Sequence, residues 1–104
     1  MIPLRIKAWS AGIIDGEGSI GWQRNGHGNK KCPIVQVSNT DGKICKVLHE
    51  HWEGRLYLRV RKDRPRNKPI WSWRIMGRKC RIFLKDVEKY LVSKREKAEE
   101  ILSN

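Results

Sequence analysis

The sequence predicts a single α+β domain, spanning all 104 residues, in which helices cover one face of a four-stranded antiparallel sheet. Four segments alternate between apolar and polar residues with the period of two that is typical of strands. They form two consecutive pairs, and a short turn-rich segment within each pair favours a hairpin. Segments with a period of 3.6 residues precede, separate and follow the pairs. The predicted order of elements is therefore α-β-β-α-β-β-α-α.

The first helix is predicted over about residues 4–14, because Gly16 and Gly18 follow it. The strand predicted at 19–24 sets Ile20, Trp22 and Arg24 on one side. On the helix, three small residues and an acidic residue share one ridge, at the spacing i, i+3, i+4 and i+7: Ala8, Ala11, Gly12 and Asp15. Small residues on this ridge would let the backbone of a second helix come close.

The second strand is predicted at 30–38, after a turn or flexible loop at 25–29. A helix with a 3.6-residue apolar period then begins near Thr40 or Asp41, either of which can cap it. Gly54 ends this helix. We expect the helix to pack by a single apolar stripe.

The second hairpin is predicted from strands at 55–62 and 70–75, with a loop at 63–68 between them. Alternation gives its sheet one apolar and one cationic face. Two helices follow from Arg78, the first reaching Tyr90 or Leu91. The second starts at Ser93, with Glu96 completing a capping box.

The positive charge is concentrated in one part of the chain. Lys and Arg number 23 against 11 Asp and Glu, which gives a formal charge of +12. Residues 55–79 hold ten basic residues and one acidic residue, and so carry nine of the twelve net charges. Because such a one-sided segment repels itself, a polyanionic partner explains it better than a solvated basic surface does. Nucleic acid is the leading partner.

Composition disfavours several other classes of protein. No apolar run approaches the roughly 18 residues of a membrane span, and residues 1–8 lack the apolar core of a signal peptide. We therefore expect a soluble intracellular protein with no membrane partner. Three cysteines without Cys-x-x-Cys spacing predict neither a disulfide framework nor a ribbon-type zinc site, although Cys45 and His49 could bind zinc if Cys32 approached.

Two further features leave alternatives open. Asp15 and Glu17 lie at the C-terminal end of the first helix, where the helix dipole disfavours anions by a few tenths to about 1 kcal/mol. They can serve as structural caps with basic partners, or they can bind a divalent cation together with water and phosphate. Trp22, Trp71 and Trp73 could stack on unpaired bases, but their strand phase favours packing in the core.

Residues 10–20 read Ser-Ala-Gly-Ile-Ile-Asp-Gly-Glu-Gly-Ser-Ile. This segment resembles the signature of the LAGLIDADG homing endonucleases, in the form with Gly-Glu in place of Ala-Asp. Ser10 departs from the pattern, because the family usually has Leu there. The resemblance covers the whole chain, since the α-β-β-α-β-β-α order is that of the family's half-domain. It implies one sheet that forms part of a DNA-binding saddle in a dimer.

The resemblance also implies the roles of individual residues. Glu17 matches the acidic position that binds the catalytic Mg²⁺, or another divalent cation, together with Gly16. Asp15 matches an acidic position that is more often structural. The family's polar and basic pocket residues point to Asn39 and Lys94 as further catalytic residues, with Lys94 stabilising charge on the phosphate or polarising a water. Asn39 could equally cap the following helix.

One motif per chain implies a homodimer, because cutting both strands of a duplex needs two active sites related by its two-fold symmetry. The predicted interface consists of the small-residue ridge and its acidic neighbour: Ala8, Ala11, Gly12 and Asp15. The sheet is predicted to read double-stranded DNA in the major groove. Its candidate contacts are the residues of the polar face: Gln23, Gln36, Ser38, Tyr57, Arg59, Arg61, Ser72 and Arg74.

The resemblance therefore implies an intron-encoded endonuclease that makes a Mg²⁺-dependent double-strand break at a long, near-palindromic DNA site. Two alternatives use the same fold. One is a maturase that assists splicing of an intron RNA. The other is a regulator that binds DNA without cutting it.

Overall fold

The computed structural model describes residues 1–24, 30–60 and 68–104. The turn predicted at 25–29 lies outside these residues, as does the loop predicted at 63–68 apart from Lys68. The elements follow the predicted order, with an additional 3₁₀ turn, η1. They are α1 (Leu4–Glu17), β1 (Gly18–Arg24), β2 (Lys31–Asn39), α2 (Gly42–Trp52), β3 (Arg55–Arg59), β4 (Ile70–Met76), α3 (Gly77–Val87), η1 (Glu88–Tyr90) and α4 (Arg95–Leu102).

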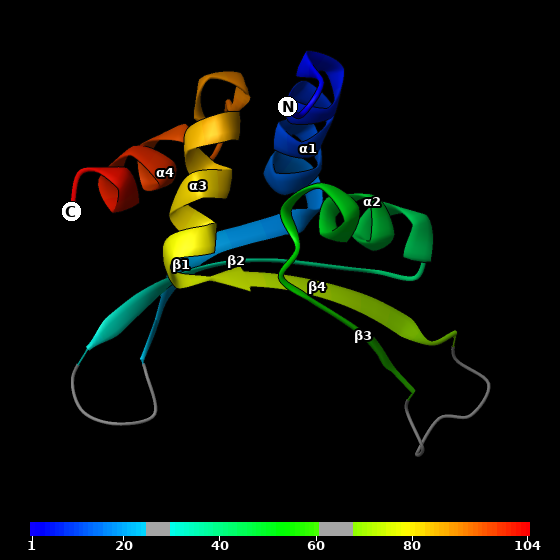
Figure 1. The fold of residues 1–104 in the computed structure, drawn as a ribbon. Coiled ribbons are helices and arrows are strands. Elements are labelled where there is room, and N and C mark those ends of the chain that lie inside the picture. The colour runs from blue at the N-terminus through cyan, green and yellow to red at the C-terminus, as the bar shows by residue number, and fades with distance from the viewer. Residues whose placement is uncertain (25–29, 61–67) are drawn as a thin grey trace.

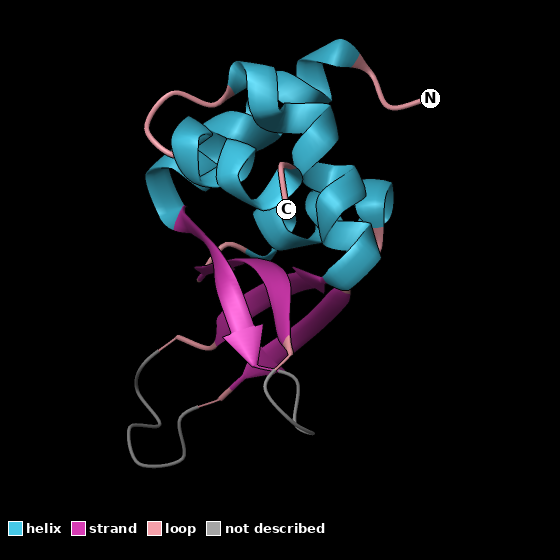
Figure 2. Ribbon diagram, turned by 90° about the vertical axis from the view of Figure 1, so that its left-hand side faces the viewer, coloured by secondary structure: helices cyan, strands magenta, loops and turns pink. Residues whose placement is uncertain are grey.

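The elements form two layers, with the helices on one face of a single four-stranded sheet (Figures 1 and 2). The strand order is β1-β2-β4-β3, and each neighbouring pair is antiparallel. Two hairpins, β1–β2 and β3–β4, are thus joined through β2 and β4. This arrangement confirms the predicted α+β class and the predicted pairing of strands.

The strand register separates the two faces of the sheet. One row of directly paired residues crosses all four strands on the face that the helices cover: Gly18, Val37, Trp73 and Leu56. The adjacent row points the opposite way, because successive side chains on a strand alternate between faces. That row consists of Ser19, Gln36, Arg74 and Arg55. The face to which it belongs is called the reading face below.

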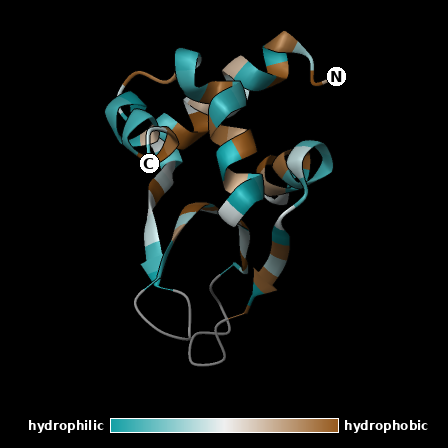
Figure 3. Cartoon of the chain, turned by 60° about the vertical axis from the view of Figure 1, so that its left-hand side comes forward, coloured by the Kyte–Doolittle hydropathy of each residue, from teal (hydrophilic) through white to brown (hydrophobic). Residues whose placement is uncertain are grey.

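The core lies between the sheet and the helices. Trp73 and Phe83 are fully buried, and Trp52 is 6% exposed. Both tryptophans pack edgewise on Phe83, with ring centroids 5.2 and 4.8 Å from it. Such pairs contribute about 0.5–1.5 kcal/mol each beyond the burial of their area. Each helix carries both hydrophobic and hydrophilic residues (Figure 3), as expected for helices that cover only one face of a sheet.

The first helix is longer than predicted, because α1 continues through Gly16 and ends at Glu17. An interior glycine costs about 1 kcal/mol relative to alanine. Hydrogen bonds from the C-terminal segment to Asp15 hold this last turn in place and offset that cost. Gly18 follows, and a Cβ there would stand 3.0 Å from Ile14 Cα, a tight contact that favours glycine.

The capping box predicted at Ser93 is wrong. The N-cap of α4 is Lys94, whose side chain makes no capping bond. The Asp15 carboxylate from α1 instead accepts the backbone N–H groups of Val92 and Lys94, at 2.7 and 3.0 Å. These two N–H groups precede α4, so Asp15 anchors the segment that leads into the helix and does not cap the N–H groups of its first turn.

The apolar side of the second hairpin is covered only in part. Leu58 and Val60 are 45% and 60% exposed, against the prediction of a continuous apolar face. The reason is that β3 lies at the edge of the described sheet, with β4 as its neighbouring strand, and ends at Arg59, so Val60 lies beyond it. Separately, none of the described helices is long and apolar enough to cross a membrane.

Candidate active site and nucleic-acid interface

Glu17 ends α1 with an exposed side chain next to the end of β2. Its Oε2 accepts a hydrogen bond of 2.7 Å from Asn39 Nδ2. Asn39 Oδ1 in turn accepts the backbone N–H of Asp41, also at 2.7 Å. Asp41 is the N-cap of α2 and accepts from the N–H of Lys43. Asn39 is therefore not the cap itself: it links the Glu17 carboxylate to the segment that enters α2.

Asp15 and Lys94 form a second, interlocked set of bonds beside Glu17. The Asp15 carboxylate binds the backbone N–H groups at 92 and 94, and Lys94 Nζ donates to the Asp15 carbonyl oxygen at 2.7 Å. The C-terminal segment is thereby tied to the last turn of α1. The Lys94 ammonium lies against this turn and makes no described bond to Glu17.

The end of α1 offers oxygen atoms for a cation. Helix ends leave carbonyl oxygens without intrahelical partners, and these carry partial negative charge. Lys94 takes the carbonyl of Asp15, whereas no hydrogen bond to the Gly16 carbonyl is found among the described residues. Glu17 likewise forms no ion pair with any Lys or Arg in the described part of the chain. A carboxylate and a carbonyl are thus available together.

The cysteine and histidine alternative finds no support among the described residues, which include no cluster of three or more His, Cys, Asp or Glu that could hold a metal. Cys45 is buried, and its thiol donates to the Val37 carbonyl. Burial raises the pKa of Cys45, and it raises the pKa of Cys80 to about 12.

The predicted DNA contacts share the reading face, with one position outside the described residues. The register puts the side chains in line across the sheet, for instance Ser38, Ser72 and Tyr57. Arg61 lies outside the described residues. The others on this face are Gln23, Gln36, Ser38, Tyr57, Arg59, Ser72 and Arg74.

Ser72 is a correction to this set, because it is only 5% exposed. Its hydroxyl bonds to that of Ser38 at 2.9 Å, which leaves Ser38 as the accessible member of the pair. The analysis of the sequence also missed Ser19 and Arg55, which complete the row containing Gln36 and Arg74. Strand alternation already put both on the polar side, so the pattern alone could have found them.

The ridge predicted as a dimer interface is divided by the structure. Ala8 and Gly12 are exposed, but Ala11 is fully buried inside the chain, so it cannot contact a second copy. The helix turns Ala11 toward the core together with Ile14. Gly16 instead continues the exposed line, at the spacing i, i+4, i+8 from Ala8. The Asp15 carboxylate is occupied by its bonds to the C-terminal segment.

The fold and the site define a class, namely an α+β domain with a polar sheet face beside a carboxylate at the end of a helix. No protein-family model matches the sequence, and no curated protein matches it. Solved structures do match. The homing endonuclease I-CvuI, crystallised with its target in the presence of Ca²⁺, is similar with a TM-score of 0.76 and 20% identity, over 96% of this chain and 65% of that one.

Two further solved structures show the same architecture. The LAGLIDADG homing endonuclease I-GzeII, with its DNA target, gives a TM-score of 0.64 at 16% identity, over 93% of this chain and 35% of that one. The group I intron-encoded I-CeuI, with DNA, gives 0.62 at 16%, over 99% and 57%. The chain thus has the fold of the LAGLIDADG homing endonucleases, as the motif predicted, and spans 65% or less of these proteins.

Proposed function

We propose that this chain is the subunit of a homodimeric, metal-dependent DNA endonuclease that makes a double-strand break at a long, near-palindromic site. The observation that carries the proposal is the exposed Glu17 carboxylate. In a chain of charge +12 it has no described cationic partner, yet Asn39 holds it at 2.7 Å. An anion at the negative end of a helix is unfavourable unless a cation joins it.

The available donors suit a hard divalent cation such as Mg²⁺. Glu17 and the Gly16 carbonyl supply oxygen only, which is the donor type that Mg²⁺ prefers. A small protein ligand set also suits Mg²⁺, since this ion keeps several waters and binds substrate phosphates. When bound, the cation would lower the pKa of a water and stabilise charge on the phosphate.

The neighbouring residues would orient this site. Asn39 fixes one carboxylate oxygen of Glu17, and its own amide oxygen is fixed by the Asp41 N–H. Lys94 Nζ uses one of its three donors on the Asp15 carbonyl, which leaves two for phosphate oxygens. Lys94 is thereby suited to stabilise charge that develops on the phosphate.

A second copy of the chain is part of the proposal. No atom outside the local helix backbone lies within 4 Å of where a Cβ would stand on Gly12 or Gly16, among the described residues. The chain's own packing therefore gives no reason for two costly helix glycines. Close approach of a second α1 at Ala8, Gly12 and Gly16 does, and it would bring two Glu17 carboxylates near each other.

The reading face supplies the proposed contacts to double-stranded DNA. Six of the predicted residues on it are exposed or half-buried. The described residues of 55–79 include no acidic residue, since Asp63 lies outside them. In the similar structures named above, I-GzeII and I-CeuI are bound to DNA. Phosphate contacts would give affinity, and a minority of the side chains would read base edges.

The test is cleavage of a randomised duplex library by the purified protein, with Mg²⁺ or with EDTA, followed by sequencing of the cut ends. We expect staggered cuts at a near-palindromic site that disappear with EDTA. Glu17→Gln should lower the rate by about 10³-fold, because it removes several kcal/mol of metal-based stabilisation. Glu50→Gln, an equal change at an exposed position of α2, should cut normally.

Metal-independent cutting, or unchanged cutting by Glu17→Gln, would contradict the proposal. Sequence-specific binding without cleavage would favour the function of a regulator that binds DNA without cutting it. Preferential binding of structured intron RNA over duplex DNA would favour the maturase.

A further inference from the structure

A basic hollow lies on the side of the sheet opposite the reading face, near the far end of the β1–β2 hairpin. It is shallow and open to solvent, with a volume of about 420 Å³, and is lined by Trp22, Lys31, Arg81 and Asn104. Lys31 lies four positions before the buried Val35 on β2, so the two share one face of the hairpin. Trp22 shares this face too, because it pairs with Pro33, two positions before Val35. The proposed contacts to duplex DNA do not use this hollow.

Two cations stand directly opposite each other at its edge. Arg24 on β1 pairs with Lys31 on β2, and both side chains are exposed. Like charges at directly paired positions of a sheet destabilise it. Neither forms an ion pair in the described part of the chain, and residues 25–29 contain no acidic residue in their sequence. Within residues 1–24, 30–60 and 68–104, this repulsion is thus left uncompensated.

The hollow also has a flat, ordered wall. The Arg81 guanidinium carbon lies 5.9 Å from the ring of Trp22. Arg81 Nη1 donates to the carbonyls of Ile101 and Asn104, at 2.6 and 3.0 Å, which fixes the guanidinium.

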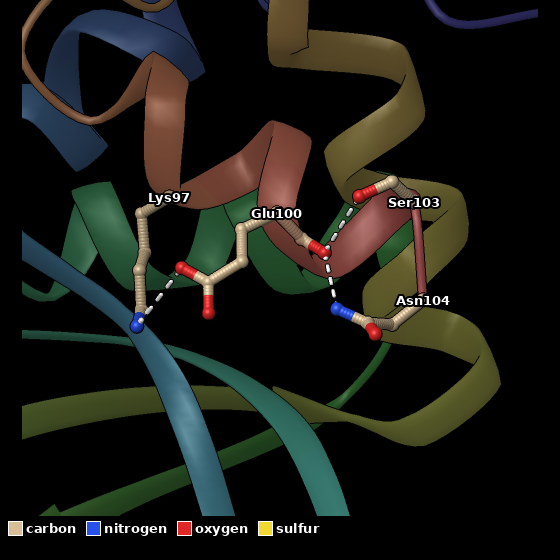
Figure 4. A network of polar contacts seen from close by, with 4 residues as sticks. All are labelled: Lys97, Glu100, Ser103 and Asn104. Atoms are coloured by element: carbon tan, nitrogen blue, oxygen red, sulfur yellow. Dashed lines mark hydrogen bonds and ion pairs between the residues drawn. The ribbon is translucent and has the colours of Figure 1, made fainter.

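The chain segment beside this wall is itself held by hydrogen bonds. Ser103 Oγ and Asn104 Nδ2 both donate to the Glu100 carbonyl, at 3.1 and 2.8 Å (Figure 4). Lys97, also drawn there, pairs with the Glu100 carboxylate at 3.4 Å. The hollow is therefore bounded by positioned groups, not by free side chains alone.

We propose that this hollow binds an unpaired segment of nucleic acid, independently of the reading face. A base would lie against Trp22 and Arg81, and the adjoining phosphates would contact Arg24 and Lys31. The combination of a basic surface with a planar aromatic or guanidinium platform is what binders of single strands use. A duplex keeps its bases stacked and has no use for such a platform, so the site favours unpaired nucleotides.

The experiment compares two double variants that change the charge equally on opposite faces. Arg24→Glu with Lys31→Glu alters the hollow, and Arg55→Glu with Arg59→Glu alters the reading face. Fluorescence anisotropy measures the affinity of each for a labelled 20-nucleotide single strand, as DNA and as RNA, and for a duplex. Thermal melting verifies folding, and the milder Arg24→Gln with Lys31→Gln replaces the first variant if it does not fold.

The hollow variant should bind single strands at least about tenfold more weakly and the duplex nearly normally, and the dependence of log K on log salt should fall by about 1.4. The reading-face variant should show the reverse pattern. A 5-iodouracil single strand should photocrosslink to Trp22. Equal losses for both ligands in both variants, or unchanged single-strand binding by the hollow variant, would overturn the proposal.

The DNA and RNA strands identify the source of the ligand. Tighter binding of RNA would point to contacts with the 2′-hydroxyl, and equal binding would point to the base and phosphate shared by both. Either result supports the site.

Discussion

The end of α1 and the reading face of the sheet are both polar, but they are held in different ways. At the end of α1, Asp15 and Glu17 each bond to residues far away in the sequence. On the reading face, Arg55 and Arg59 are exposed and take their direction from strand alternation alone. The first region is held by hydrogen bonds between distant segments, whereas these two arginines of the second make no side-chain hydrogen bond or ion pair with the described residues.

The largest effect on stability should come from Asp15→Ala. This change leaves the N–H groups of Val92 and Lys94 without their carboxylate acceptor. Bonds to a charged group contribute about 1.5–3 kcal/mol, so the free energy of unfolding should fall by about 2–3 kcal/mol. Urea denaturation measures this loss. Arg59→Ala, the matched change on the reading face, should cost less than about 0.5 kcal/mol. Equal losses would erase the contrast between the two regions.

The next effect concerns metal binding. Asn39→Ala removes the group that orients the Glu17 carboxylate. Loss of such an orienting partner typically weakens metal binding by about 10- to 100-fold. Titration with Mn²⁺ in the presence of duplex DNA, followed by electron paramagnetic resonance, measures the affinity. Asn39→Asp separates orientation from charge. An unchanged affinity in Asn39→Ala would show that Glu17 does not depend on this contact.

Both regions illustrate what the sequence can predict. Alternation within 55–62 and 70–75 predicted the polar side of the second hairpin, because strand periodicity is local. The motif likewise pointed to Glu17, although the first helix was predicted to end at about residue 14 and continues to Glu17. The bonds from Asp15 to Val92 and Lys94 could not be predicted, since they join positions 77 and 79 residues apart.

The burial of individual side chains also could not be predicted from the sequence pattern. Ala11 and Ala8 are the same residue type on one helix, and only packing decides that Ala11 is buried while Ala8 is exposed. Ser72 is similar, because its neighbours in the sheet enclose it and Ser38 takes its hydroxyl.

A third prediction distinguishes the stability of the single chain from the stability of its proposed dimer. Gly12→Ala should raise the stability of the isolated chain by about 0.5–1 kcal/mol, because the position has open space and alanine favours helix. The same methyl group would separate two packed α1 helices and weaken the dimer. Sedimentation equilibrium measures the dimer dissociation constant, and chemical denaturation at low concentration measures the chain. A dimer unaffected by Gly12→Leu would exclude this ridge as the interface.

The smallest effect should appear on the reading face. Arg59→Ala should weaken duplex binding for all sequences alike, if Arg59 contacts phosphate. The slope of log K against log salt should then fall by about 0.9. Binding isotherms at several salt concentrations give this slope. Lys85→Ala, on an exposed position of α3, is the matched control and should leave the slope unchanged. A loss confined to one target sequence would identify Arg59 as a base contact instead.

The most direct test of one active site per chain uses mixed dimers, once the library has supplied a target site. Wild-type chains and Glu17→Gln chains with different affinity tags are combined, and the mixed dimer is isolated through both tags. We predict that it nicks a single strand of the target, whereas the wild-type dimer cuts both. Double-strand cutting by the mixed dimer at the wild-type rate would contradict the account, because Glu17 would then not be required in each subunit.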